Sequence, residues 1–107
     1  MTVYPPNGDD VAAFLGQSDD ASLVALAAEQ VPIVTELARA YTRGNGFDAA
    51  GLPYDDVSAV ITCATARLVA NPEQQAYQVG TVAYRGGFTG WSLAETFVLN
   101  RYRTRLA

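Results

Sequence analysis

The chain contains no histidine and no lysine, and only one of its 107 residues is a cysteine. Without histidine, neither a Ser-His-Asp nor a Cys-His catalytic site can be assembled within the chain. The single cysteine, Cys63, allows no internal disulfide and no zinc site built from thiolates. These absences exclude several large classes of enzyme and metalloprotein, and we expect no catalytic residue, no cofactor and no metal ligand.

Targeting signals are also missing. The first ten residues, MTVYPPNGDD, have no basic segment followed by an apolar one, so they do not resemble a secretory signal. No apolar run approaches the ~20 residues that a membrane-spanning helix needs. We therefore expect a soluble intracellular product, or a component of something that is assembled inside a cell, with no membrane partner.

Positive charge is scarce except at the C-terminus. Eleven acidic residues stand against seven arginines, which gives a formal charge of −4. Three of these arginines lie in the last seven residues, so the preceding hundred residues carry −7. Binding nucleic acid by phosphate neutralisation takes a clustered cationic surface. The acidic body of this chain excludes that mode of binding.

Half of the residues are hydrophobic, which predicts a single folded domain over residues 1–107. Two helices are predicted in its first half, a short one that stops at Gly16 and a longer one that ends at Gly44. The candidate N-caps are Asp9 or Asp10 for the first helix and Ser18, Asp19 or Asp20 for the second. Pro32 either kinks the second helix or restarts it. The apolar stripe of the second helix comprises Leu23, Leu26, Ala27, Val34, Leu37, Ala38 and Tyr41.

Residues 54–71 predict a third helix, which the Asn71-Pro72 pair ends. One face is apolar and the other is nearly uncharged, a pattern that is typical of a central, buried helix. Cys63 on this helix is interpreted as a small hydrophobe, the alternative being a reactive cysteine. The apolar face comprises Val57, Val60, Ile61, Ala64 and Leu68.

Residues 72–91 lack helical periodicity, and such a long irregular segment in a small domain is usually functional. Apolar residues on either side of Gly80-Thr81 predict two short extended pieces, and hence a hairpin or a bulged arm. The glycines of RGGFTG resemble a phosphate-binding loop only superficially, because no GxxxxGK[ST] pattern is present.

The last helix is predicted to begin at Ser92, with Glu95 at the spacing of a capping box. Its apolar contacts are expected from Leu93, Phe97, Val98, Tyr102 and Leu106. The predicted fold is therefore mainly α, a small bundle of three to four helices with a short extended or hairpin arm before the C-terminal helix.

The C-terminal arginines have two interpretations. Cations near a helix C-terminus are each favourable by roughly 0.3–1 kcal/mol, which suits Arg101 and Arg105 in a solvated helix end. Arg103 projects to another side of such a helix, whereas in an extended tail all three would share one face. We favour a docking element for an acidic or carboxylate-rich partner. An acidic body and a basic tail also suggest self-association, with many weak contacts acting together.

Three long stretches resemble one family: VAAFLGQSDDASLVALAAEQVPIVTELARAYTRGNGF, DDVSAVITCATARLVANPEQ and FTGWSLAETFVLNRYR. Together, from about Asp9 to Arg105, they resemble the head-to-tail connector (adaptor) proteins of long-tailed bacteriophages that infect actinobacteria. The most specific pieces are AYTRGNGF, TARLVANPEQ and the GW-SL-E-LNRYR finish.

This resemblance implies a small helical virion protein that forms a ring of about twelve copies beneath the portal protein of a DNA-filled capsid. The ring would extend the DNA channel and meet a downstream connector, stopper or tail-terminator protein. It would reside at the head–tail interface after assembly in the host cytoplasm. DNA would pass through without sequence-specific binding during packaging and ejection, because an acidic ring repels phosphates.

Two groups of contact residues are expected within such a ring. The tail from about residue 100 would dock on the portal through Arg101, Tyr102, Arg103, Arg105 and Leu106. The arm would join subunits or meet the next ring through Tyr77, Val79, Val82, Tyr84, Arg85, Phe88 and Trp91.

Two other functions fit parts of the sequence. The second and third helices could form the helix-turn-helix of a small DNA-binding regulator. A nearly uncharged third helix argues against this, because a recognition helix needs polar and basic side chains that bind to base edges. Three pairs of aspartates could bind a metal ion, although each pair sits where a helix cap is expected. These pairs are Asp9-Asp10, Asp19-Asp20 and Asp55-Asp56.

Overall fold

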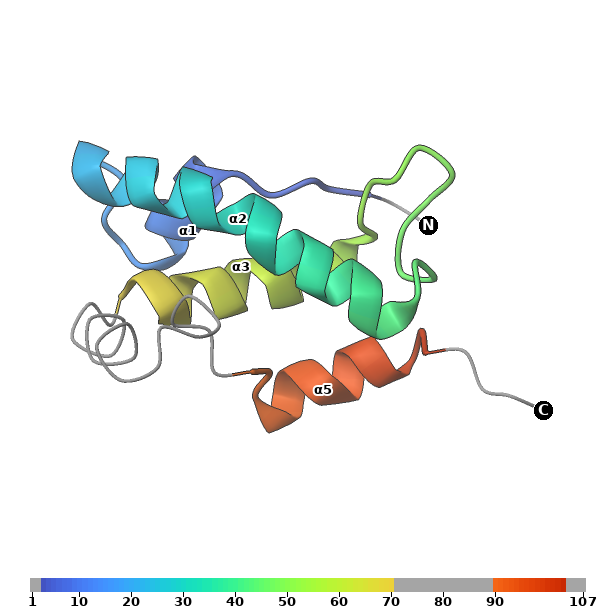
Figure 1. Cartoon of the computed structure of the whole chain (residues 1–107). Helices are drawn as coiled ribbons and strands as arrows, with labels where there is room; N and C mark the ends of the chain where they lie inside the picture. The colour runs from blue at the N-terminus through green and yellow to red at the C-terminus, as the bar shows by residue number, and fades with distance from the viewer. Residues whose placement is uncertain (1–2, 71–89, 104–107) are drawn as a thin grey trace.

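The computed structural model describes residues 3–70 and 90–103. Over these residues the chain forms a bundle of four helices: α1 (Gly8–Phe14), α2 (Ala21–Thr42), α3 (Asp55–Val69) and α5 (Leu93–Asn100). Figure 1 shows α2 in front, α1 and α3 behind it, and α5 along the lower edge. The prediction of a mainly helical, small bundle is confirmed. The predicted arm, apart from Gly90 and Trp91, lies outside the described residues.

The N-cap of α1 is Asn7, so the prediction of Asp9 or Asp10 is wrong. The Asn7 side chain accepts a hydrogen bond from the backbone N–H of Asp10 at 2.9 Å, and the Asp10 carboxylate accepts one from the N–H of Asn7 at 2.9 Å. Asparagine is as good an N-cap residue as aspartate, so the helix and its capping box begin earlier than the predicted N-caps. The first residue of the helix, Gly8, lies so close to α2 that a Cβ at this position would be 2.5 Å from the carbonyl oxygen of Val24.

Helix α2 begins at the predicted Asp20, whose carboxylate accepts a hydrogen bond from the N–H of Leu23 at 3.1 Å. It ends with Arg43 and Gly44 in the left-handed region, at φ of 58° and 82°. The helix runs on through Pro32, so of the two predicted alternatives, a kink or a restart, the restart does not occur. Packing on both sides of the proline holds the helix together, through the buried side chains of Ala27, Val31, Val34 and Ala38.

Helix α3 is the predicted core helix, and it contacts each of the three other described helices. All five residues of its predicted apolar face are buried, which confirms that face: Val57, Val60, Ile61, Ala64 and Leu68. The opposite, uncharged side is less covered than expected, because Thr62 and Cys63 are half-buried and Ala59 is exposed. The helix is therefore central, but it is open along one side.

The capping box of α5 is confirmed. The Ser92 hydroxyl accepts from the N–H of Glu95 at 3.2 Å, and the Glu95 carboxylate accepts from the N–H of Ser92 at 2.8 Å. Leu99 is fully buried, whereas Leu93 is 72% exposed and Phe97 is 65% exposed. The expected core contacts of Leu93 and Phe97 are therefore wrong. Leu99 lies four residues after Glu95, so both fall on the inward side, and Leu93 and Phe97 share the outward one.

The other predicted apolar contacts of the C-terminal segment are those of Val98, Tyr102 and Leu106. Val98 and Tyr102 are partly buried against the core, as expected. Leu106 lies outside the described residues.

By length and composition alone, α2 is apolar enough to cross a membrane, which corrects the expectation that no stretch approaches ~20 residues. The most apolar part of α2 is 22% buried within the chain. The core helix of a soluble protein and a signal sequence satisfy the same criteria, so this single helix carries little weight for a membrane location.

The two leucines of α5 provide a direct test of its orientation. Replacing the buried Leu99 (Leu99→Ala) is expected to lower the free energy of unfolding by about 2–5 kcal/mol, because it leaves a cavity in the core. The matched change at the exposed position, Leu93→Ala, should alter it by less than about 0.5 kcal/mol. Urea denaturation of both variants measures the difference, and a larger effect from Leu93→Ala than from Leu99→Ala would show that the helix is turned the other way.

Candidate interaction site

The C-terminal segment is bound to the rest of the bundle through Asp56, at the first turn of α3. The hydroxyl of Tyr102 lies 2.9 and 2.8 Å from the two carboxylate oxygens of Asp56, to which it donates. Arg101 Nη1 lies 3.2 Å from Asp56 Oδ2. The rings of Tyr54 and Tyr102 also pack together, with their centroids 6.1 Å apart. The start of α3 and the end of α5 are thus held at one point.

A second contact joins the same segment to the end of α2. The hydroxyl of Tyr41 donates a hydrogen bond to Asn100 Oδ1 at 2.8 Å. The Arg103 guanidinium lies over the Tyr41 ring, 4.7 Å from its centroid. The structure therefore brings three of the five predicted docking residues together, but each is engaged by its own chain. They are Arg101, Tyr102 and Arg103, and the other two, Arg105 and Leu106, lie outside the described residues.

Tyr102 contributes more to this anchor than Arg101. A hydrogen bond to a charged acceptor is worth roughly 1.5–3 kcal/mol when it is shielded from water. The ion pair of Arg101, whose side chain is 65% exposed, contributes roughly 0–1 kcal/mol. Burial, together with the hydrogen bond and the negative charge of Asp56, raises the pKa of Tyr102 to about 12. The phenol therefore remains a donor throughout the physiological range.

The other end of α5 is fixed by Arg67 of α3. Its Nη1 lies 2.7 Å from Glu95 Oε2, and its Nη2 donates to the carbonyl oxygen of Gly90 at 2.8 Å. Glu95 is buried, so this ion pair compensates a carboxylate that has been removed from water. Trp91, the one predicted arm contact within the described residues, is partly buried against the core. The remaining arm contacts, Tyr77, Val79, Val82, Tyr84, Arg85 and Phe88, lie outside the described residues.

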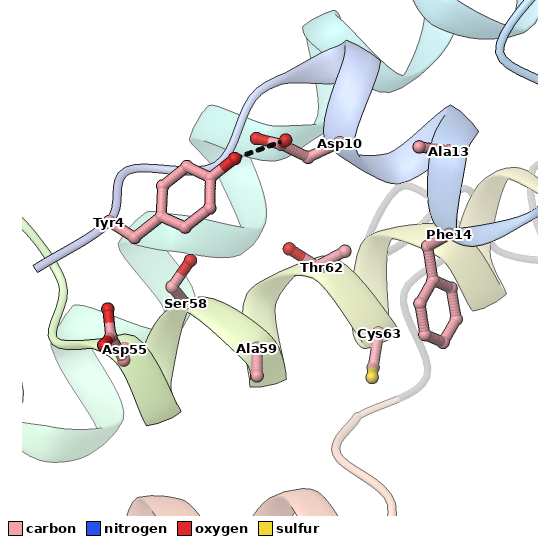
Figure 2. A pocket seen from close by; sticks show the side chains of 9 residues that line it. All are labelled: Tyr4, Asp10, Ala13, Phe14, Asp55, Ser58, Ala59, Thr62 and Cys63. Carbon is pink, nitrogen blue, oxygen red and sulfur yellow. Dashed lines mark hydrogen bonds between the residues drawn. The ribbon is translucent and has the colours of Figure 1, made fainter.

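A groove of about 560 Å³ runs between α1 and α3. Figure 2 shows Tyr4 and Asp10 above Ser58 towards one end, with Phe14 beside Cys63 at the other. The Tyr4 hydroxyl donates to Asp10 Oδ1 at 2.6 Å. The groove is lined by Tyr4, Asp10, Ala13, Phe14, Asp55, Ser58, Ala59, Thr62 and Cys63.

Sequence reasoning missed this groove, although one signal was present. The uncharged second face of α3 predicts complete burial, whereas Ala59, Thr62 and Cys63 line an open surface. Burial, followed by the negative charge of Glu95, raises the pKa of Cys63. Its thiol is therefore protonated at neutral pH, which favours the interpretation of Cys63 as a small hydrophobe.

Exposed apolar side chains mark two places on the described surface. Tyr4 and Phe14 border the groove between α1 and α3. The other large exposed hydrophobic residues lie on α2 and α5, which pack against each other: Ile33, Leu37, Leu93 and Phe97.

The aspartate pairs act at helix starts rather than as a joint cluster. Asp20 caps α2, Asp10 completes the box of α1, and Asp56 holds the C-terminal segment. Across residues 3–70 and 90–103, no three His, Cys, Asp or Glu side chains gather in a way that could hold a metal ion.

Comparisons with protein-family models, with curated proteins and with solved structures found no match.

The Asp56–Tyr102 bond predicts a specific effect on titration. The change Asp56→Asn is expected to lower the pKa of Tyr102 from about 12 towards its ordinary value of 10.0, because it removes the charged acceptor. NMR titration of the tyrosine ring carbons measures this shift, with Tyr102→Phe for assignment. The neighbouring change Asp55→Asn is the control and should leave the pKa in place. An unchanged pKa in Asp56→Asn would contradict the assigned bond.

The same bond should also make stability depend on alkaline pH. Below pH 10 the phenol is protonated in the folded and the unfolded chain, so its contribution is fully present. Between pH 10 and about 12 the unfolded chain releases this proton first, and the contribution is lost. Urea denaturation across this range should show a steeper loss of stability in the parent chain than in Tyr102→Phe.

Proposed function

We propose that this chain is a structural virion protein that forms an oligomeric ring between the capsid portal and the next protein of the tail. The proposal comes from the sequence resemblance to head-to-tail connectors, and the helical bundle is the kind of fold which that resemblance implies. The ring would extend the DNA channel, and its acidic body would keep the duplex from adhering to the wall.

One structural observation carries this proposal. The stretches that resemble the connector family most specifically are distant in sequence, yet they bind one another in the fold. Tyr41 of AYTRGNGF contacts Asn100 and Arg103 of the LNRYR finish. Arg67 of TARLVANPEQ contacts Gly90 and Glu95 of the GW-SL-E piece. Because these stretches contact one another, they form one set of interacting residues. This set supports the proposal more strongly than three unconnected similarities would.

A glycine in the first of these stretches belongs to the same set. A Cβ on Gly46 would lie 2.7 Å from Val57 Cγ2 and 3.5 Å from the Tyr102 ring. The AYTRGNGF turn, the start of α3 and the LNRYR finish are therefore packed as closely as their backbones allow. This packing gives a physical reason for a glycine at this position of the turn.

The contacts of the tail refine its proposed role. Arg101 and Tyr102 are held by Asp56, and Arg103 is held by Tyr41, so we assign these three to positioning the tail. Docking on an acidic or carboxylate-rich portal surface would then fall mainly to Arg105 and Leu106. Removal of the whole segment from residue 100 onward would also remove the anchor, so a shorter truncation is the sharper test.

The regulator alternative gains no support from the geometry. A helix-turn-helix joins its helices by a turn of ~3–4 residues. In this chain residues 43–54 separate α2 from α3, and they include the Phe47–Pro53 bridge. A connection of this length and structure differs from that motif.

Truncation after Arg103 tests the tail. The shortened chain is expected to fold, because its described contacts remain, but to be lost from portal-bearing heads. The double change Arg105→Glu with Leu106→Asn should have the same effect, and Arg43→Glu is the control for an equal change of charge elsewhere. Quantitative mass spectrometry of purified heads measures the copies of the chain per portal vertex.

The parent chain is expected at a fixed number of copies per vertex, near twelve. Full incorporation of the truncated chain would disprove the tail assignment. Tailed, infectious particles that lack the parent chain would disprove the proposed function itself.

A further inference from the structure

The outward face of α5 carries a short row of residues at helical spacing. Leu93, Phe97 and Arg101 follow one another at intervals of four residues, so they lie along one side. All three side chains are exposed to solvent. Two large apolar groups followed by a cation form an amphipathic row about 12 Å long, at 1.5 Å per residue.

The floor of the α1–α3 groove carries a matching row on α3. Asp55, Ala59 and Cys63 also follow one another at intervals of four residues, over the same length of about 12 Å. This row has a carboxylate at one end, a small residue in the middle and an apolar side chain at the other end. Figure 2 shows Ala59 and Cys63 on the side of α3 away from Tyr4 and Asp10, with Phe14 beside Cys63, and all three side chains of the row line the groove.

The two rows are complementary in charge and in size when they run in opposite directions. Arg101 then lies opposite Asp55, the large Phe97 lies opposite the small Ala59, and Leu93 lies opposite Cys63. Arg101 already pairs with Asp56, but a guanidinium has five N–H donors and can bind a second carboxylate. An apolar helix face that enters an apolar groove, with anchors at i and i+4, is a common mode of recognition.

One chain cannot make this contact with itself. Glu95 and Leu99 are buried on the inward side of α5, where Glu95 pairs with Arg67 of α3. Leu93 and Phe97 are exposed on the opposite side of α5, so they are not packed on the α3 of their own chain, whereas the long side chain of Arg101, at the end of the helix, reaches Asp56. A second copy is the occupant whose charge and spacing fit.

We propose that the Leu93–Phe97–Arg101 face of α5 in one copy binds the α1–α3 groove of the next copy, with the rows antiparallel. This contact rests on the proposed ring and names the surface between its subunits. The two surfaces differ, so the contact is heterologous, and repetition of it builds a closed ring or an open filament rather than a dimer.

Disulfide cross-linking tests the contact and uses the single native cysteine. The change Leu93→Cys places a thiol opposite Cys63 of the neighbouring copy. Mild oxidation of the concentrated, purified protein is expected to give a ladder of dimers, trimers and larger species on a non-reducing gel. The ladder should disappear in Leu93→Cys combined with Cys63→Ser. The control Ala25→Cys, at an exposed position on α2, should give no ladder.

Three results would overturn the proposed contact or its antiparallel arrangement. Absence of a ladder from Leu93→Cys would show that these faces do not meet. Dimers that persist without Cys63 would show that α5 pairs symmetrically with itself. A ladder from Arg101→Cys as strong as that from Leu93→Cys would overturn the antiparallel arrangement, because it would place the wrong end of the row beside Cys63.

Charge exchange provides a second, independent measurement. Asp55→Arg alone is expected to weaken self-association roughly tenfold, because it places two cations opposite each other. Combination with Arg101→Glu should restore it, whereas combination with the control Arg43→Glu should not. Sedimentation velocity measures the association, and failure of the paired exchange to restore it would contradict the Arg101–Asp55 pairing.

These results are separate from those that test the proposed function. A chain that yields no ladder but is found in portal-bearing heads would refute the contact and leave the connector role in place. A ladder from a chain that is absent from heads would support the contact and refute the connector role.

Discussion

The buried carboxylate of Glu95 determines how α5 lies on the bundle. It accepts a hydrogen bond from the first residue of its own capping box, and it pairs with Arg67 of α3 at 2.7 Å. An unpaired carboxylate at this depth would be costly, so this side of α5 can face the core only in the position where Arg67 meets Glu95. Leu99 lies on the same side of α5 and is buried in the core, whereas Leu93 and Phe97 are exposed to solvent. The interaction surface of α5 is thus a consequence of one ion pair.

The two ends of α5 are held in different ways. Arg67 fixes the beginning through Glu95 and the carbonyl oxygen of Gly90. Asp56 fixes the end through Tyr102, with a smaller contribution from Arg101. Both partners lie on α3, at its last and first turns. A helix of eight residues is marginal by itself, and these two anchors give it a defined position on the core.

The sequence predicted features that depend on local chemistry or on a long periodic pattern, such as the Ser92 capping box and the buried face of α3. Prediction from the sequence was wrong where two local alternatives were nearly equal in energy and tertiary packing determined which of them forms. Asn7 and Asp9 are comparable caps, and the helix begins at the first of them, where Gly8 packs closely against α2. In α5, either Leu93 and Phe97 or Glu95 and Leu99 could face the core by spacing alone. The pair that contains Glu95 is buried, and Glu95 is bound by Arg67, which is distant in sequence. The groove required the placement of α1 beside α3, which no local pattern encodes.

Helix α3 carries both surfaces of the proposed contact between copies. It forms the floor of the groove on one side, and on another it supports α5 through Arg67 and Asp56. The angle between successive copies is then set by how α1 and α5 each pack on α3. In a closed ring a small error in this angle is repeated at every step. The curvature of the assembly would therefore be encoded in the side chains that orient α5 on α3.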